Sequence, residues 1–159
     1  MLKHNAFIEE RLFRDIIESI PLVSLDFVIR QGEKILLGKR LNKPAKDYWF
    51  TIGGRILKNE HLDNTMQRIA KDELGVQLSS APKFIGVFEH LYDDSIYEGV
   101  STHYINLVYE IEIDDFSNLP REQHDIYRWF TVGEMLESVD VHTYVKDIFI
   151  PRYTDKTHS

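Results

Sequence analysis

Residues 53–78, "GGRILKNEHLDNTMQRIAKDELGVQL", constrain the fold more than any other part of the chain. A glycine pair opens the stretch as a loop, and a charged amphipathic segment over residues 61–74 predicts a helix. Gly75 ends that helix, because glycine is the residue that most often follows a helix C-terminus. A helix with one apolar stripe needs a surface to pack on, so the stretch predicts a helix that covers a sheet.

Glu73 is the unusual residue of this helix. At about 100° per residue, Leu62, Met66 and Ile69 fall on one stripe, and Glu73 falls in the middle of it. A carboxylate on an apolar face is unfavourable unless another group neutralises it. Three interpretations are open: an ion pair with an arginine of the sheet, fraying of the helix, or a divalent cation. The glycine pair favours the cation, because it lets a backbone carbonyl approach the ion closely.

The patterns on either side of this stretch predict an α/β (α+β) fold, with a mixed β-sheet covered by helices on both faces. The length of 159 residues suits one domain over residues 1–159. Expected helices cover residues 6–19, 61–74, 132–138 and 143–153. Expected strands cover residues 22–30, 34–40, 48–52, 83–92, 103–113 and 126–131.

The composition argues against several classes of protein. The chain has no cysteine, which removes disulfides, thiol nucleophiles and cysteine-bound zinc and suits the reducing cytoplasm. The amino-terminal segment is too charged for a signal peptide, and no apolar run has membrane-spanning length, so no membrane partner is expected. A formal net charge of −7 disfavours nonspecific nucleic-acid binding, although a few local arginines suffice for a phosphate ligand.

The opening stretch resembles the Nudix box, the signature of a hydrolase family. The matching residues share their spacing with that box: Gly54, Glu60, Arg68, the pair Asp72 and Glu73, and the pair Gly75 and Val76. The usual box has a glutamate directly after the arginine and a glutamate pair before the last glycine. This chain has Ile69 and Asp72 at two of those positions and keeps Glu73.

Motifs outside the box are similar to a divergent Nudix group with the same depleted box, the GDP-mannose mannosyl hydrolases. They are "PLVSLDF", "LLGKR", "YWF", "GGR", "THY", "EQHD" and "YRW". The similarity runs from Phe7 to Trp129, with Ile52 where that group tends to have proline. It implies a Nudix-type α/β/α sandwich. It also implies hydrolysis of GDP-mannose, or of GDP-glucose, by water attack at the sugar carbon C1 with inversion, which needs fewer metal-binding acids than attack at phosphorus.

The resemblance further implies a metal site and a general base. The backbone carbonyl of Gly53, the carboxylate of Glu73 and the side-chain amide of Gln123 match the metal ligands of the group. Mg²⁺ suits so sparse a set because it keeps water molecules and takes substrate phosphates as ligands, and Mn²⁺ is the alternative. His124 matches the general base, since imidazole titrates near neutral pH. Taken without the resemblance, "REQHD" is a surface loop with a histidine beside acids.

Three arginines are candidates for the substrate-binding part of the site. Arg40 and Arg55 match catalytic arginines that contact the diphosphate, where a guanidinium binds phosphate oxygens bidentately and stays charged as the bond breaks. Ordinary surface charge is the alternative for both. Arg68 is a further substrate-binding candidate, and an i,i+4 pair with Asp72 is its alternative.

Three more residues are candidates for the sugar and phosphate contacts. Asp26 interrupts an apolar strand, so it is either satisfied within the fold or directed at the sugar, where its carboxylate would stabilise positive charge on the ring. The resemblance favours the sugar. Tyr104 matches a tyrosine near the phosphates, and its alternative is an aromatic residue of the core or the sheet surface. His90 matches a histidine of the group and is the third candidate, without an assigned role.

The expected helix over residues 6–19 carries the nucleotide contacts that the resemblance implies. Phe7, Ile8 and Phe13 match positions that touch the nucleotide, partly across a dimer interface. An aromatic ring offers a large stacking face to a purine. The alternative is that these residues form the core face of the helix. The homodimer follows from the resemblance alone.

Two rival functions stay open. One is a conventional pyrophosphohydrolase that attacks phosphorus of a nucleotide sugar or a nucleoside triphosphate; the missing acids of the box argue against it. The other is a non-catalytic protein that binds nucleotide sugars. The retention of Glu73 together with Gln123 and His124 argues against that second rival.

The assignment of His124 as the base predicts the effect of His124→Gln. The variant should lower turnover far more than nucleotide affinity, because glutamine cannot accept the proton of the attacking water. Steady-state kinetics with GDP-mannose and calorimetric titration with GDP would measure the two effects. Turnover near that of the wild type would remove His124 from the mechanism.

Overall fold

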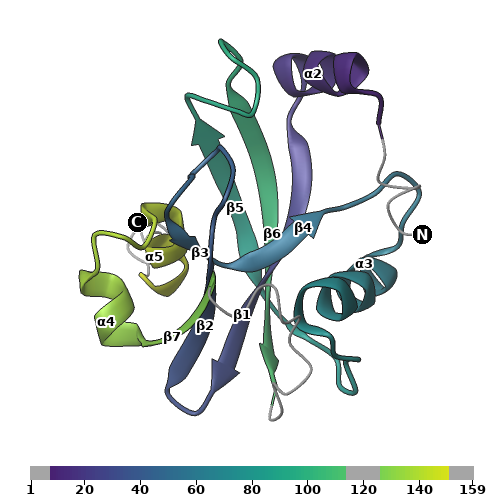
Figure 1. Ribbon diagram of the computed structural model, residues 1–159. Helices are drawn as coiled ribbons and strands as arrows, with labels where there is room; N and C mark the ends of the chain where they lie inside the picture. The colour runs from purple at the N-terminus through teal and green to yellow at the C-terminus, as the bar shows by residue number, and fades with distance from the viewer. Residues whose placement is uncertain (1–7, 114–125, 151–159) are drawn as a thin grey trace, which may run out of the picture.

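The computed structural model describes residues 8–113 and 126–150, which form a mixed β-sheet with helices on both faces (Figure 1). The expected fold class is confirmed. The elements, in chain order, are α2 (Glu10–Ser19), β1 (Leu22–Gln31), β2 (Lys34–Lys39), β3 (Trp49–Phe50), β4 (Ile52–Arg55), α3 (Leu62–Ile69), η1 (Ala70–Leu74), β5 (Lys83–Tyr92), β6 (Thr102–Glu112), β7 (Tyr127–Thr131), α4 (Val132–Glu137) and α5 (Thr143–Phe149).

Strand β1 is the centre of the sheet, because it pairs with three other strands. It runs parallel to β6 over nearly its whole length, antiparallel to β4 in its first half, and antiparallel to β2 at its end. The strand order is β3-β2-β1-β6-β5, with β4 on β1 and β7 on β2. The apolar run of β1 is buried from Ser24 to Ile29, as expected for a strand covered on both faces.

Two apolar cores lie on opposite faces of the sheet. On one face, Phe27 of β1 packs with Ile69 of α3 and Leu74 of η1. On the other face, Val28 packs in one cluster with residues of α4 and α5, which include Met135. Neighbouring residues of a strand point to opposite faces, so Phe27 and Val28 join different cores. Figure 1 shows α3 on one side of the sheet and α4 with α5 on the other.

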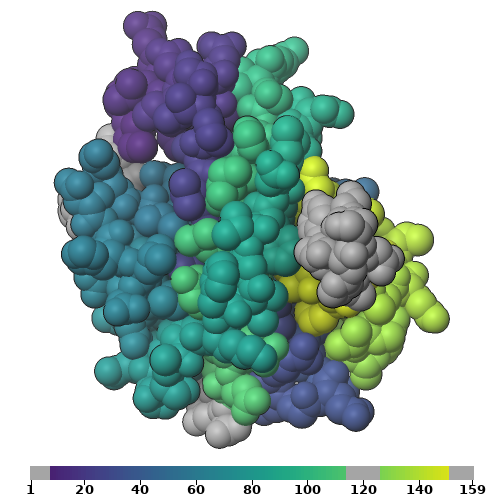
Figure 2. All heavy atoms as spheres, turned by 180° about the vertical axis from the view of Figure 1, so that it is seen from behind, coloured from purple at the N-terminus to yellow at the C-terminus, as the bar shows by residue number. Residues whose placement is uncertain are grey.

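Helix α2 covers one end of the sheet, beside the loop between β5 and β6. Ile17 of α2 packs with Leu22 and Val100, and Phe13 packs against this cluster. The rings of Phe13 and Tyr97 lie edge to face, with centroids 6.5 Å apart. Figure 2, seen from behind, shows the purple residues of α2 next to that loop at the top of the molecule. The apolar face of α2 is therefore used for packing.

The expected helix over residues 61–74 is confirmed, with one addition at its end. It continues from α3 into η1, a π-helical turn, and ends at Gly75, whose φ of 68° is left-handed. The N–H of Gly75 donates to the carbonyl of Lys71 at 3.0 Å. Glu73 lies inside this wider turn, so the helix does not fray there.

The glycine pair lies in a strand, and the expectation of a loop was wrong. Residues 48–52, expected as one strand, are divided between two: β3 pairs with β2, and β4 pairs with β1. Gly53 and Gly54 belong to β4, opposite Asp26 and Leu25 of β1. The local sequence favoured a loop because glycine is rare in strands, but the long-range ladder to β1 decides the outcome.

Two helix boundaries also differ from the expectation. Helix α2 begins at Glu10, because the side chain of Glu9 accepts hydrogen bonds from the N–H groups of Arg11 and Leu12 and caps the helix there. Helix α5 ends at Phe149, since the next residue, Ile150, is extended and precedes a proline in the sequence. Across the described residues, each helix is too short or too polar to span a bilayer.

Candidate active site

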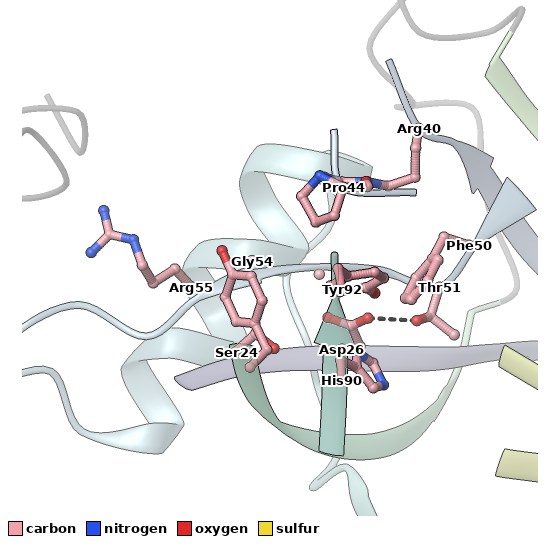
Figure 3. Close-up of a pocket in the computed structure, with 12 residues that line it drawn as sticks. Ser24, Asp26, Arg40, Pro44, Phe50, Thr51, Gly54, Arg55, His90 and Tyr92 are labelled. Carbon is pink, nitrogen blue, oxygen red and sulfur yellow. Dashed lines mark hydrogen bonds between the residues drawn. The ribbon is translucent and has the colours of Figure 1, made fainter. Parts of the chain in front are cut away.

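A cavity of about 100 Å³ opens where β1, β4, β5 and β6 meet the loop after β2 (Figure 3). It brings together six of the residues that the sequence predicted for the site: Asp26, Arg40, Gly53, Arg55, His90 and Tyr104. Ser24, Pro44, Phe50, Thr51, Gly54 and Tyr92 complete its lining. These twelve positions come from distant parts of the sequence, so the sheet pairing assembles the site.

The register of the sheet explains why these side chains converge. Asp26 of β1 lies opposite Gly53 of β4, and His90 of β5 lies opposite Tyr104 of β6. Residues opposite each other in an antiparallel ladder point to the same face, and residues two apart along a strand share that face. The polar residues Ser24 and Asp26 of β1 therefore point to one side of an otherwise apolar strand.

Asp26 is the most perturbed carboxyl of the cavity. Asp26 is 8% exposed, and its Oδ2 atom accepts a hydrogen bond of 2.5 Å from the Thr51 hydroxyl. Burial raises the pKa of Asp26 to about 6, while the hydrogen bond from Thr51 and the charge of Arg40 act in the opposite direction. The carboxyl is thus mostly ionised at neutral pH and gains a proton as the pH falls through about 6.

Gly53 has no room for a side chain. A Cβ at this position would overlap Oδ1 of Asp26 and the backbone carbonyl oxygen of Leu25. At Gly54, the nearest atoms to such a Cβ belong to the side chain of Ile69, at 3.7 Å, which is an ordinary contact. The carboxylate of Asp26 therefore occupies the space that the first glycine leaves open.

Arg40 and Arg55 bring positive charge to the cavity from two sides. Nε of Arg40 donates to the carbonyl of Pro44 at 3.2 Å, so the loop after β2 holds this side chain. The guanidinium of Arg55 lies over the ring of Phe13 in α2, 5.3 Å from its centroid. Figure 3 shows the Arg55 side chain directed away from Asp26 and Arg40, at the far side of the cavity. A diphosphate is an anion that two such arginines can bind.

His90 is almost completely buried and uncharged at neutral pH. It is 4% exposed, and its ring stacks on Tyr144 at a centroid distance of 4.6 Å. Burial, and then the neighbouring His142, lower the pKa of His90 to about 4. Its Nε2 atom has no hydrogen-bond partner among residues 8–113 and 126–150. A neutral imidazole has one N–H donor and one acceptor nitrogen, and the Nε2 atom of His90 is itself buried.

Two tyrosines line the cavity, of which the sequence predicted one. Burial raises the pKa of the predicted residue, Tyr104, and Arg40 and Arg55 lower it less. Burial also raises the pKa of Tyr92, which lies in the same strand as His90 and two residues after it. Both phenols therefore keep their protons and can donate hydrogen bonds to phosphate oxygens. Alternate residues of a strand point to the same face, so the spacing of two residues from His90 could have identified Tyr92 as a further residue of the cavity.

Glu73 is a candidate metal ligand that lies on the helix beside the sheet. It is half-buried, and no lysine or arginine within the described ranges forms an ion pair with its carboxylate. Burial, and then the charge of Asp72, raise the pKa of Glu73. Of the three open interpretations, an arginine partner in the described part of the sheet and fraying are therefore excluded. A carboxylate and a backbone carbonyl are hard oxygen ligands of the kind that a divalent cation, the third interpretation, requires.

The histidine and acidic side chains of the described residues contain no group of three that could hold a metal ion by themselves. The metal ligands predicted from the sequence are of a different kind, because they are one carboxylate, one backbone carbonyl and one side-chain amide. Ile69, one turn before Glu73, lies against Gly54, so the helix and the glycine pair are in contact. Gln123, the third member, lies outside the described residues, as do His124 and Phe7.

Arg68 is absent from the residues that line the cavity and binds the segment between β4 and α3. Its Nε and Nη2 atoms donate to the two carboxylate oxygens of Glu60 at 2.7 and 2.9 Å, and Nη2 also donates to the carbonyl of Arg55 at 2.9 Å. Arg68 thus pairs with Glu60 and not with Asp72, the partner that the alternative interpretation expected. Thr65 donates to the same carboxylate at 2.8 Å. Arg68 thereby fixes the backbone from which the Arg55 side chain extends.

The two described residues of the predicted nucleotide contacts lie at the α2 end of the molecule. Phe13 is half-buried and faces both the Arg55 guanidinium and the Tyr97 ring. Ile8 is also half-buried and precedes α2. Phe13 thus serves the packing of α2, as one interpretation expected, and it also contacts a residue of the cavity.

Comparison with known proteins places these features in a family. The family model of the NUDIX domain matches residues 21–152. The chain is 41% identical over 116 residues to the low-salt glycan biosynthesis protein Agl8 of Haloferax volcanii, which covers 72% of this chain and 74% of that protein.

Solved structures share the fold at low sequence identity. A MutT NUDIX hydrolase from Burkholderia pseudomallei matches with a TM-score of 0.65 and 21% identity, over 84% of this chain and all of the other. A MutT protein from Methanosarcina mazei matches with a TM-score of 0.67 and 19% identity, over 89% of this chain and 99% of the other.

Replacing each glycine of β4 by alanine should have effects of very different size. Gly53→Ala should lower the free energy of unfolding by about 2 kcal/mol or more, because its Cβ must displace Asp26 or the β1 backbone. Gly54→Ala should change that free energy by less than about 0.5 kcal/mol, since its Cβ meets only a side chain at ordinary distance. Urea denaturation of the three proteins measures the difference. Equal effects of the two variants would contradict the close approach at Gly53.

The Glu60–Arg68 pair predicts a defined dependence of stability on pH. The hydrogen bonds from Arg68 lower the pKa of Glu60 from 4.5 to about 2. A carboxyl with a lowered pKa stabilises the fold fully above its unfolded value, and this stabilisation is lost as the pH falls towards the folded value. Glu60→Gln should therefore be less stable than the wild type at pH 6, and the difference should shrink between pH 4.5 and 2.

Melting temperatures of wild type and Glu60→Gln, compared across that pH range, provide the measurement. Other carboxyl groups titrate in both proteins, so their contributions cancel in the difference. A difference that stays constant from pH 6 to pH 2 would show that the ionised Glu60 carboxylate does not stabilise this part of the fold.

Proposed function

Since the chain belongs to the NUDIX family, we propose that it is a hydrolase of nucleotide sugars that splits GDP-mannose, or GDP-glucose, into GDP and the free sugar. Water would attack C1 of the sugar, and a single displacement would invert the configuration there. This differs from attack at phosphorus, which a conventional pyrophosphohydrolase of the family would perform.

The observation that carries this proposal is the burial of Ile69. Ile69 is 2% exposed and belongs to the core beneath α3, together with Ala70, which is fully buried. This helix face therefore packs on the sheet through apolar groups, where the usual box has a carboxylate. Glu73 is left as the acid of the box on this face. A site with so few acids suits a reaction in which the diphosphate is the leaving group and the water is activated elsewhere.

The cavity supports the proposal through its distribution of charge. Arg40 and Arg55 would bind the diphosphate and neutralise the charge that develops on it. The buried carboxylate of Asp26 would lie near the sugar ring and stabilise the positive charge that builds on it as the C1–O bond lengthens. His90 and Tyr104 add uncharged hydrogen-bonding groups.

A divalent cation fits the donor set of the chain. Glu73 is a desolvated carboxylate without a cationic partner in the described part of the chain, and hard oxygen ligands are those that Mg²⁺ prefers. The Gly53 carbonyl, Glu73 and Gln123 would hold Mg²⁺, with Mn²⁺ as the alternative. When bound, the ion supplies Lewis-acid stabilisation of the leaving diphosphate.

Residues of the chain would accept the proton of the water and neutralise the charge on the leaving group. His124 accepts a proton from the attacking water, whose oxygen forms the new bond to C1. The C1–O bond to the diphosphate breaks, and its electron pair stays on the diphosphate oxygen. Arg40 and Arg55 hold that oxygen's charge, so GDP leaves without an acid that protonates it.

The relative from Haloferax volcanii supports the choice of substrate class. Its name assigns it to glycan biosynthesis, and sugars enter such pathways as activated nucleotide derivatives. The absence of cysteine from the sequence suits an enzyme of the cytoplasm, the compartment in which nucleotide sugars are found. A homodimer that shares nucleotide contacts through Phe7, Ile8 and Phe13 completes the proposal.

Incubation with GDP-mannose and Mg²⁺ in oxygen-18 water tests the reaction directly. Attack at C1 should give unlabelled GDP and mannose that carries one labelled oxygen, which mass spectrometry of both products detects. GMP together with mannose 1-phosphate, with the label on a phosphate, would show conventional attack at phosphorus. GDP-mannose that binds without any product would favour the non-catalytic protein.

A further inference from the structure

Thr51 lies between β3 and β4 and contributes its side chain to the cavity. It is 7% exposed, and its hydroxyl donates to Oδ2 of Asp26 at 2.5 Å. Figure 3 shows this hydrogen bond, and it shows the second carboxylate oxygen of Asp26 on the side opposite Thr51. The contact therefore engages one oxygen and leaves the other turned to the cavity.

The strand geometry brings Thr51 to Asp26. Asp26 pairs with Gly53, and Thr51 precedes Gly53 by two positions, so Thr51 lies on the same face of the sheet as the carboxylate. Diagonal neighbours on one face of a ladder are within reach of each other's side chains. Gly53 places no atoms between them, because it has no Cβ.

Both oxygens of the carboxylate are constrained by this arrangement. Oδ1 lies in the space that a Cβ of residue 53 would fill, and Oδ2 is held by the hydroxyl. Asp26 is surrounded by buried groups, since β1 is covered on both faces. A buried carboxylate without a donor would lose its orientation or turn towards Arg40, the arginine whose charge acts on Asp26.

We propose that Thr51 is a positioning residue for Asp26, whose hydroxyl fixes the carboxylate so that its second oxygen faces the sugar ring. The inference rests on the proposed function, in which Asp26 stabilises positive charge on the ring. A fixed carboxylate acts on the transition state, because the charge exists mainly there, and it contributes little to the binding of the diphosphate. Thr51 therefore affects turnover and leaves nucleotide affinity unchanged.

Three variants at this position separate the hydroxyl from the shape of the side chain. Thr51→Val keeps the shape without the donor, Thr51→Ser keeps the donor without the methyl group, and Thr51→Ala removes both. We expect Thr51→Val to lower kcat for GDP-mannose about 10-fold to 100-fold, the factor that loss of one charge-assisted hydrogen bond produces. KM and the Kd for GDP should stay within about threefold. Thr51→Ser should retain most of the turnover.

Thr131→Val is the matched control. In the wild type, the Thr131 hydroxyl accepts a hydrogen bond from the N–H of Glu134 and caps α4, away from the cavity. The valine variant loses this hydrogen bond, as Thr51→Val loses its own. The variant should lower the melting temperature and leave kcat within about twofold. Should Thr51→Val fail to fold, Thr51→Ala provides the same comparison with Thr51→Ser, since alanine also lacks the hydroxyl donor.

Each outcome decides the inference. A loss of kcat in the valine or alanine variant that serine restores, with GDP affinity unchanged, supports it. Unchanged kcat in the valine variant overturns it and leaves the proposed function standing, since the wild type still releases GDP and mannose. Equal losses of kcat and GDP affinity, or a serine variant as slow as valine, would show a merely structural role. Wild-type protein without that product pair would overturn both proposals together.

Discussion

The antiparallel pairing of β4 with β1 is the constraint on which the site depends. It places Asp26 opposite Gly53, and the carboxylate fits only because residue 53 has no side chain. The same ladder brings Thr51 to the carboxylate and directs the chain towards Arg55 and α3. One stretch of backbone pairing thus determines the position of the acid, of its hydrogen-bond donor and of an arginine.

Burial then determines the chemistry of the groups that the ladder brings together. It raises the pKa of Asp26 to about 6 and lowers that of His90 to about 4, so a carboxylate and a neutral imidazole share one cavity at neutral pH. Arg40 favours the charged form of Asp26, which keeps the carboxylate ionised despite its burial. Electrostatic interactions are stronger in such a site than in water, and in the proposed reaction this would stabilise the charges on the sugar ring and on the diphosphate.

Much of the fold follows from the sequence, because its strongest signals are local. The helix that ends at Gly75 and the strands on either side are present, and Asp26, which was singled out because it interrupts an apolar strand, lies in the lining of the cavity. The strand conformation of Gly53 and the role of Thr51 in the lining depend on pairing with β1, some 25 positions away, and no local pattern encodes a register of that kind. Arg68 was a substrate-binding candidate, yet its guanidinium is engaged by Glu60, a pairing that only the folded loop reveals.

Ile69 links the chemistry of the site to the stability of the fold. A glutamate at this buried position would need a cation to neutralise it, so the docking of α3 would depend on metal. An isoleucine that is 2% exposed instead contributes the transfer of an apolar side chain, about 1.5–3 kcal/mol, whether or not a cation is present. Apolar packing therefore docks helix α3 on the sheet, and the hydrogen bonds from Arg68 to Glu60 and to the Arg55 carbonyl add to it. Glu73, one turn further along and half-buried, is not part of this apolar cluster, so the proposed metal would bind it without the docking of α3 depending on the ion.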